Sequence, residues 1–248
     1  EAVSMIDNDH TRVIDASTAH RTFPDWCYGL PELGASFLEK LQTSKRTAVP
    51  GCHASGFISL VYPLVAAGIL PADADITCHS ITGYSGGGKK MIAQYEEDGR
   101  SPLLASPRQY GLTQQHKHLK EMQSVCGLTK APIFCPIVSD FYSGMVVTVP
   151  LFAGMLHPGY TAEDIKAVYR TQYTGPIVRY CDGIDEEGFL SANALTGSDA
   201  MQITVAGNEE RILLLSRFDN LGKGASGAAV ECMNIMLGDD PTHGLDLI

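Results

Sequence analysis

The stretch Pro50-Gly51-Cys52-His53-Ala54-Ser55-Gly56 places a cysteine between a short strand and a helix, and this constrains how the chain can fold. Residues 45–49 predict a short buried strand, which the Pro-Gly dipeptide ends. Apolar residues then recur at helical spacing from Phe57 to Val65, so Cys52 is predicted to lie near a helix N-terminus. The helix dipole favours a thiolate there and is expected to lower the pKa of Cys52. We therefore predict a nucleophilic cysteine, with a small buried apolar residue as the alternative.

Strands and helices alternate along much of the chain, which indicates an α/β protein. Residues 12–15 predict a strand, and a helix is expected near residues 35–42. A run of predicted strands follows in the second half, with a hairpin around Asn208-Glu209, before an apolar helix at residues 228–237. The order suggests a sheet domain inserted into a nucleotide-binding domain. We predict that residues 1–50 and 221–248 belong to the nucleotide-binding domain and that residues 51–220 form the catalytic and dimerisation domain.

Composition excludes several classes of partner. The net charge of −10 argues against binding to nucleic acid or to anionic membranes. Seven cysteines are scattered without a CxxC pair, which favours a reducing compartment such as the cytoplasm over a disulfide framework or a zinc site. No apolar run is long enough to span a membrane. The chain starts at Glu1, inside a segment that is predicted to be helical, so we expect that the N-terminal part of a longer protein is missing.

Two further segments could carry chemistry. The glycine-rich turn Gly83 to Lys89 has most of the P-loop spacing, but Lys90 stands where that motif needs a hydroxyl, so we reject a P-loop. Its backbone amides could still hold a phosphate, or the segment could be a plain turn. His116 and His118 are predicted at the start of a helix, where residues two apart do not share a face. A metal pair is therefore not expected, and we expect at most one of them to reach a cleft.

With these segments placed, the chain resembles the N-acetyl-gamma-glutamyl-phosphate reductase family, and most closely its shorter second type. Six ordered blocks carry the resemblance, and together they extend from near residue 13 to near residue 237: Val13 to Arg21, Trp26 to Leu33, Pro50 to Ser55, Gly83 to Lys89, Phe141 to Met145, and Asp219 to Gly227. The resemblance implies a Rossmann-like domain, truncated at its N-terminus, with an inserted α+β domain on a mostly antiparallel sheet. It also implies a homo-oligomer.

The resemblance implies a reaction as well. Similar enzymes attack an acyl phosphate with a cysteine, release phosphate, and reduce the resulting thioester to an aldehyde with NADPH. Cys52 matches the nucleophile, and His118 is our choice for the acid/base residue because it precedes Leu119-x-Glu121, which resembles the family's continuation. His116 would then contact or support the substrate.

The substrate's carboxylate and phosphate require cations, and four candidates are available: Lys89, Arg108, Arg179 and Arg211. We predict Lys89, which follows the glycine turn, and Arg179 as substrate contacts. The cofactor contacts that the resemblance implies are Ser17, Ser85, Gly86 and Asn220, each of which could instead be an ordinary turn or cap residue.

Two departures from the family pattern stand out. The residue after the family's cysteine is commonly tyrosine, and here it is His53, which could alter the pocket beside the nucleophile. The family's N-terminal glycine-rich strand-turn-helix, where the cofactor pyrophosphate would rest, does not appear in this sequence, so we expect weak cofactor binding by the chain as printed. Three alternatives therefore stay open: an aspartate-semialdehyde dehydrogenase-like enzyme, a cysteine hydrolase or acyltransferase without nucleotide, and a non-catalytic fragment.

Overall fold

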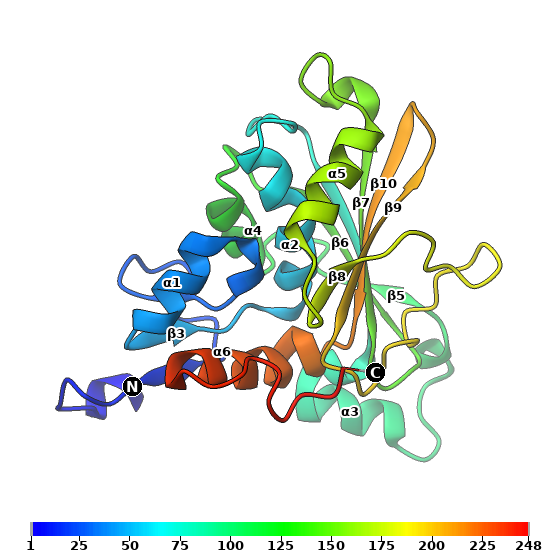
Figure 1. Ribbon diagram of the computed structural model, residues 1–248. Helices are drawn as coiled ribbons and strands as arrows, with labels where there is room; N and C mark the ends of the chain where they lie inside the picture. The colour runs from blue at the N-terminus through cyan, green and yellow to red at the C-terminus, as the bar shows by residue number, and fades with distance from the viewer. Residues whose placement is uncertain (1, 248) are drawn as a thin grey trace.

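Two β-sheets of unequal size organise residues 2–247, the part of the chain that the computed structural model describes (Figure 1). The smaller sheet has the strand order β1-β3-β2, and the larger has the order β5-β6-β4-β7-β10-β9-β8. The strands are β1 Val13–Asp15, β2 Cys27–Tyr28, β3 Arg46–Ala48, β4 Thr77–Gly83, β5 Arg108–Gln109, β6 Ile133–Ser139, β7 Met145–Phe152, β8 Val178–Tyr180, β9 Met201–Gly207 and β10 Arg211–Phe218. The α-helices are α1 Ala35–Thr43, α2 Cys52–Ala66, α3 Gly88–Glu96, α4 Leu119–Cys126, α5 Ala162–Gln172 and α6 Gly227–Leu237.

The smaller sheet is parallel and joins the two ends of the sequence. Strands β1 and β2 both pair with β3 in parallel. Helix α6 comes from the C-terminal end, yet it contacts both β1 and α1 (Figure 1). Their common core contains Leu41 of α1 and Cys232, Ile235 and Met236 of α6. This arrangement of parallel strands with covering helices is what the α/β prediction requires.

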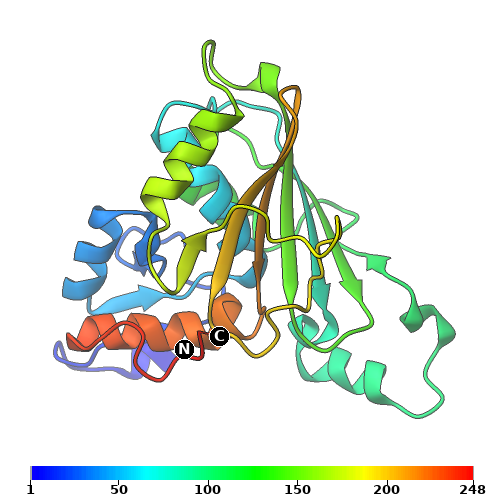
Figure 2. The same cartoon turned by 45° about the vertical axis from the view of Figure 1, so that its right-hand side comes forward.

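The larger sheet is mixed, with four antiparallel and two parallel pairs of neighbouring strands, so the prediction of a mostly antiparallel sheet is confirmed. Helices α2 and α5 cover one face, where the main apolar core lies, and the other face is open except where the segment between β8 and β9 packs on it, with Glu186 paired to Arg217 (Figure 2). Alternation along the strands separates the two faces. In β4, Cys78, Ser80 and Thr82 are buried while Ile81 is exposed.

Most predicted elements are present, and their ends follow local chemistry. The hairpin between β9 and β10 turns at Asn208, whose side chain accepts hydrogen bonds from the backbone N–H groups of Glu210 and Arg211. Thr161 precedes α5, and its backbone N–H donates to Asp164 at 2.8 Å, as in a capping box. The N-terminal residues Ala2–Met5 form a 3-10 turn, whereas the sequence predicted a helix. The predicted domain bounds stay a prediction.

Candidate active site

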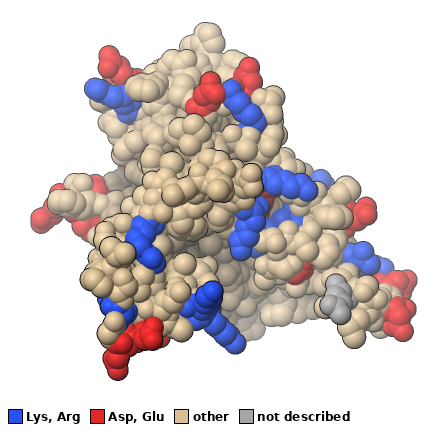
Figure 3. Space-filling model, turned by 180° about the vertical axis from the view of Figure 1, so that it is seen from behind, with Lys and Arg blue, Asp and Glu red and all other residues tan. Residues whose placement is uncertain are grey.

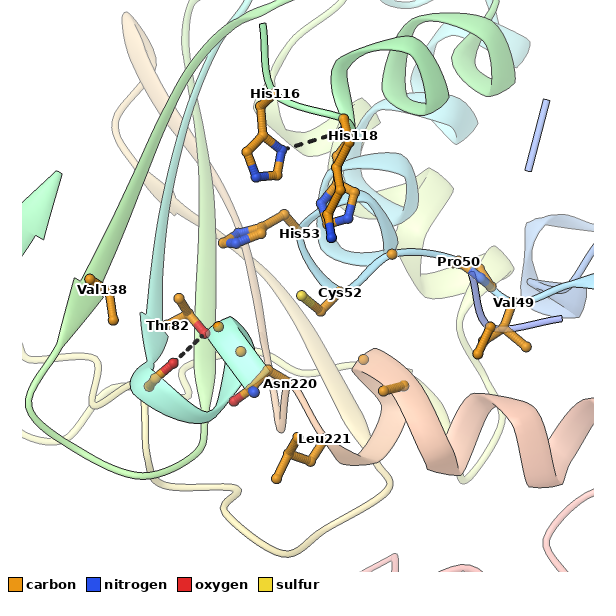
Figure 4. Close-up of a pocket in the computed structure, with 18 of the residues that line it drawn as sticks. Val49, Pro50, Cys52, His53, Thr82, His116, His118, Val138, Asn220 and Leu221 are labelled. Carbon is orange, nitrogen blue, oxygen red and sulfur yellow. Dashed lines mark hydrogen bonds between the residues drawn. The ribbon is translucent and has the colours of Figure 1, made fainter. Parts of the chain in front are cut away.

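Cys52 is the first residue of α2, at the mouth of a cavity of about 360 Å³ (Figure 4). Strand β3 ends at Ala48, and the turn Pro50-Gly51 leads directly into the helix, so the predicted position of Cys52 at a helix N-terminus is confirmed. The cavity is lined by the loop after β1, the turn before α2 and its start, the end of β4 and its glycine turn, the loop between β5 and α4, strand β6, and the segment around the π-helical turn Gly222–Ser226. Gly224 of that turn packs so closely that a Cβ there would lie 3.0 Å from the Cβ of Cys52.

The expected lowering of the Cys52 pKa is wrong for the protein without substrate. Burial raises the pKa of Cys52 to about 11, because desolvation penalises the thiolate more than its neighbours favour it. The His53 backbone N–H and the charges of Arg21 and Lys117 act in the opposite direction but do not outweigh burial. Cys52 is therefore a neutral thiol at pH 7, and its nucleophilic form requires a base that accepts the proton.

His118 provides a base beside Cys52. It directly precedes α4, and its ring lies against the residue before Cys52: a Cβ on Gly51 would lie 2.3 Å from His118 Nε2. Burial lowers the pKa of His118 strongly, and the nearby His53, His116, Arg21 and Lys117 lower it further. The imidazole is therefore neutral and has a free lone pair, but its lowered pKa makes it a weak base in the protein without substrate. Its Nδ1 is buried and has no hydrogen-bond partner among the described residues. In Figure 4 the ring extends toward the Cys52 side chain.

His116 lines the same cavity, so the expectation that at most one of the two histidines reaches a cleft is wrong. The reason is that α4 begins at Leu119 and not near Gln114, which leaves both histidines in the preceding loop, where helical spacing does not apply. Their ring centroids are 4.8 Å apart, and His116 Nδ1 accepts a hydrogen bond from the His118 backbone N–H at 3.3 Å. Burial lowers the pKa of His116 as well.

A buried ion pair holds the turn that carries Cys52. Glu121 Oε1 accepts hydrogen bonds from the Gly51 backbone N–H at 2.9 Å and from the Tyr28 hydroxyl at 2.7 Å, while Oε2 faces Arg21 Nη1 at 3.3 Å. Burial raises the pKa of Glu121, although Arg21 opposes the change. Arg21 also donates to the carbonyl oxygen of Val49 at 2.9 Å. No role was predicted for Arg21 or Glu121 from the sequence, although each lies in or beside a segment that resembles the family.

The predicted cofactor contacts are only partly brought together. Gly86 and Asn220 line the cavity. Ser85 does not line it but bonds to Asn220, whose Nδ2 donates to Ser85 Oγ at 2.9 Å. Ser17 also lies outside the lining, and its neighbour Ala16 lines the cavity instead. The Ser17 hydroxyl donates to Asp15 at the end of β1, at 2.8 Å.

The two predicted substrate cations, Lys89 and Arg179, do not line the cavity. Arg179 lies in β8, at the edge of the large sheet, and lines a separate hollow with Arg170. Lys89 is exposed in the first turn of α3 and is not part of the lining. The cavity instead has Arg21 and Lys117, which sequence spacing did not single out because they come from two loops far apart in the chain. Figure 3 shows Lys and Arg side chains on both sides of a hollow in the middle of one face, with Asp and Glu side chains mostly toward its edges.

Two negative findings concern residues 2–247. Within them, no set of three or more His, Cys, Asp or Glu side chains is arranged to hold a metal ion. The helices described in that range are too short or too polar to cross a membrane.

Known proteins resemble this chain over most of its length. The family described as "Semialdehyde dehydrogenase, dimerisation domain" matches residues 52–220. An N-acetyl-gamma-glutamyl-phosphate reductase from Rhizobium meliloti (strain 1021) is 43% identical over 244 residues, which cover 96% of this chain and 79% of that protein. A protein of the same name from Brucella ovis is 42% identical over 245 residues, with the same shares covered.

Solved structures show the same fold at low sequence identity. Aspartate semialdehyde dehydrogenase II from Vibrio cholerae superposes with a TM-score of 0.69 at 18% identity, covering 92% of this chain and 72% of that chain. A probable aspartate-semialdehyde dehydrogenase from Pseudomonas aeruginosa gives a TM-score of 0.67 at 14% identity, covering 91% and 72%. At these identities the likeness concerns the fold alone.

Proposed function

This chain belongs to the N-acetyl-gamma-glutamyl-phosphate reductase family, and from that premise we propose that the Cys52 cavity is where an N-acetyl-glutamyl 5-phosphate is reduced to N-acetyl-glutamate 5-semialdehyde with release of phosphate. This is a step of arginine biosynthesis. The observation that carries the proposal is the meeting of a thiol, a neutral imidazole and two cations in one cavity: Cys52, His118, Arg21 and Lys117.

The first half of the reaction follows from the resting protonation states. The Cys52 thiol passes its proton to neutral His118 as the sulfur attacks the acyl carbon. A carbon–sulfur bond forms, the bond from carbon to the phosphate oxygen breaks, and phosphate leaves with that electron pair. Arg21 and Lys117 hold the anionic groups of the substrate and stabilise the leaving phosphate. The product of this half is a thioester on Cys52, and the imidazolium of His118 holds the proton.

Three glycines leave part of the cavity wall without side chains, and we propose that a flat cofactor ring binds there. Gly86, Gly87 and Gly224 line it, and a Cβ at Gly86 or Gly224 would come within 3.3 Å and 3.0 Å of neighbouring atoms, so these positions keep the wall free of side chains. Semialdehyde dehydrogenases use a nicotinamide cofactor, and we propose NADP(H), with Gly86 and Asn220 as contacts. A reduced nicotinamide held by these residues would supply the hydride that reduces the Cys52 thioester.

The second half restores the enzyme. The thiohemiacetal oxyanion collapses to the aldehyde, the carbon–sulfur bond breaks, and the departing sulfur takes back the proton held by His118. His116 lies against His118 and supports its ring position. The burial that keeps the free His118 neutral also makes its imidazolium a strong acid, so the proton returns readily.

A reverse assay tests the function and its main alternative. The purified protein is given phosphate, an oxidised nicotinamide cofactor, and either N-acetyl-glutamate semialdehyde or aspartate semialdehyde, and the absorbance of the reduced cofactor is followed. We expect a preference of about 100-fold or more for the N-acetylated aldehyde. A preference for aspartate semialdehyde would favour the alternative, and release of free acid without cofactor would favour a hydrolase.

We further propose that the open face of the large sheet is a homodimer interface. The face contains Ile81, Ile133, Phe152 and Leu213, which are all exposed and which alternate with core residues along neighbouring strands. Exposed apolar side chains spread over four neighbouring strands are typical of an interaction surface, and the matching family is named for dimerisation. The seven cysteines are all free, which supports a reducing location such as the cytoplasm.

The dimer prediction is tested with Leu213→Glu combined with Ile81→Glu. Two charges placed on the apolar face are expected to convert the dimer to a monomer at micromolar concentration, measured by light scattering. Leu237→Glu is the matched control, because Leu237 is exposed on α6 and does not belong to the sheet. A dimer that persists in the double variant, or that also dissociates in the control, would contradict this interface.

A further inference from the structure

His53 has no part in the reaction as described, yet it lies beside Cys52 in the first turn of α2 and is almost fully buried. Both of its ring nitrogens have partners: Nδ1 lies 2.6 Å from Ser80 Oγ, and Nε2 lies 2.7 Å from the Tyr110 hydroxyl. Its ring centroid is 5.6 Å from that of His118 (Figure 4). Burial lowers the pKa of His53 to about 3, so the ring is neutral and carries one N–H.

Ser80 decides which ring nitrogen carries that hydrogen. Ser80 lies in β4 on the covered face of the sheet and is fully buried. Within residues 2–247, His53 Nδ1 is the partner of its hydroxyl, and no other hydrogen bond of that hydroxyl is formed. A buried O–H without an acceptor is costly, so Ser80 donates to Nδ1. Nδ1 then carries no hydrogen, and Nε2–H donates to the oxygen of Tyr110.

This direction fixes what Tyr110 can offer to the cavity. Tyr110 follows β5 and lines the Cys52 cavity. Its oxygen accepts from His53, so its own hydroxyl hydrogen is not used by His53 and is available to the cavity. Burial raises the pKa of Tyr110 well above its usual value, with Cys52 contributing, so the hydroxyl keeps its hydrogen at neutral pH. With the opposite tautomer, the Tyr110 hydroxyl would donate its hydrogen to His53 Nε2 and could act toward the cavity only as an acceptor.

We propose that Ser80 and His53 form a positioning relay that holds the Tyr110 hydroxyl as a hydrogen-bond donor toward an oxygen of the bound acyl phosphate. The relay rests on the proposed function for the identity of that acceptor. The directions of the two hydrogen bonds, from Ser80 to His53 and from His53 to Tyr110, do not depend on the proposed function, because they follow from the burial of Ser80. His53 is a positioning residue that acts through Tyr110, and it neither accepts the Cys52 proton nor contacts the reacting carbon.

The tautomer is tested without turnover. Histidine labelled with ¹⁵N gives long-range ¹H–¹⁵N spectra that distinguish the two neutral tautomers, and the His53 signals are assigned by their loss in His53→Gln. We expect the Nε2–H form between pH 6 and pH 8. An Nδ1–H form would overturn the relay whatever the enzyme's substrate proves to be.

Kinetics test the link to Tyr110. The amide of His53→Gln can reach the position of Nε2, whereas that of His53→Asn can reach only the position of Nδ1, so the two form a matched pair. We expect His53→Asn to lower kcat/KM about 100-fold and His53→Gln to stay within about fivefold of wild type. In a Tyr110→Phe background, His53→Asn is expected to cause no further loss. Equal losses in the matched pair, or additive losses with Tyr110→Phe, would overturn the proposal. A wild-type protein that is inactive with both aldehydes would contradict the proposed function and leave the tautomer result standing.

Discussion

Cys52→Ser is expected to lower kcat/KM of the reverse assay by roughly 10⁴-fold or more, because it removes the group on which the thioester forms. A serine hydroxyl fits the same site, so the fold and the cavity should be kept. Its proton is far harder to remove than that of a thiol, and neutral His118 is not a strong enough base to compensate. The measurement is the initial rate of reduced-cofactor formation, with circular dichroism to confirm folding.

The matched control is Cys181→Ser. Cys181 is also a free, partly exposed cysteine, but it lies just after β8 and does not line the cavity. We expect this variant to keep wild-type activity. If Cys52→Ser retained even a tenth of the wild-type rate, no obligatory thioester could form on this residue.

Lys223→Met is expected to destabilise the protein by about 3–5 kcal/mol at pH 8, because it leaves the buried carboxylate of Glu231 and the partly buried carboxylate of Glu32 without a cation. Lys223 is fully buried in the π-helical turn, 2.6 Å from Glu32, and it is also hydrogen-bonded to Glu231. Burial by itself would lower the pKa of Lys223, but Glu231 and Glu32 outweigh it and raise the pKa, so the lysine is charged. The same turn carries Gly224, which packs on Cys52, so the ion cluster also supports the active site.

The pH dependence of this loss has a definite sign. Burial raises the pKa of Glu231, Glu32 raises it further, and Lys223 lowers it. Without the lysine, the folded-state pKa of the carboxyl rises further above its unfolded value near 4.5. The folded variant then binds more protons than the unfolded chain above that pH, so its stability falls as pH rises. In the wild type the pKa of Glu231 is already raised to about 8, so both proteins lose stability up to that pH. The difference from wild type should therefore be larger at pH 9 than at pH 7, measured by urea unfolding.

Lys130→Met is the control for loss of an ion pair. Lys130 pairs with Asp75 at the surface, where the side chains are 48% and 93% exposed. Because solvent screens such a pair, we expect no change beyond experimental error. A Lys223→Met variant that is as stable as the control at both pH values would show that the buried cluster makes no net contribution.

The sequence determined those features that depend on neighbours along the chain. The Pro50-Gly51 turn and the apolar spacing after it placed Cys52 at the start of a helix, and alternation predicted β6, β7, β9 and β10. These patterns can be recognised in the sequence because periodicity and turn chemistry act over a few residues. The family resemblance added His118 as the partner of Cys52, which helical spacing would not have found.

Only the tertiary structure decided the pKa of Cys52 and which charged residues line the cavity. The Cys52 pKa is raised and not lowered, because burial by segments distant in sequence outweighs the local helix dipole. The cavity's cations are Arg21 and Lys117, not Lys89 and Arg179, because two loops about a hundred residues apart meet at Gly51. Desolvation and charge depend on three-dimensional neighbours, and these are set by packing, which no spacing along the chain records.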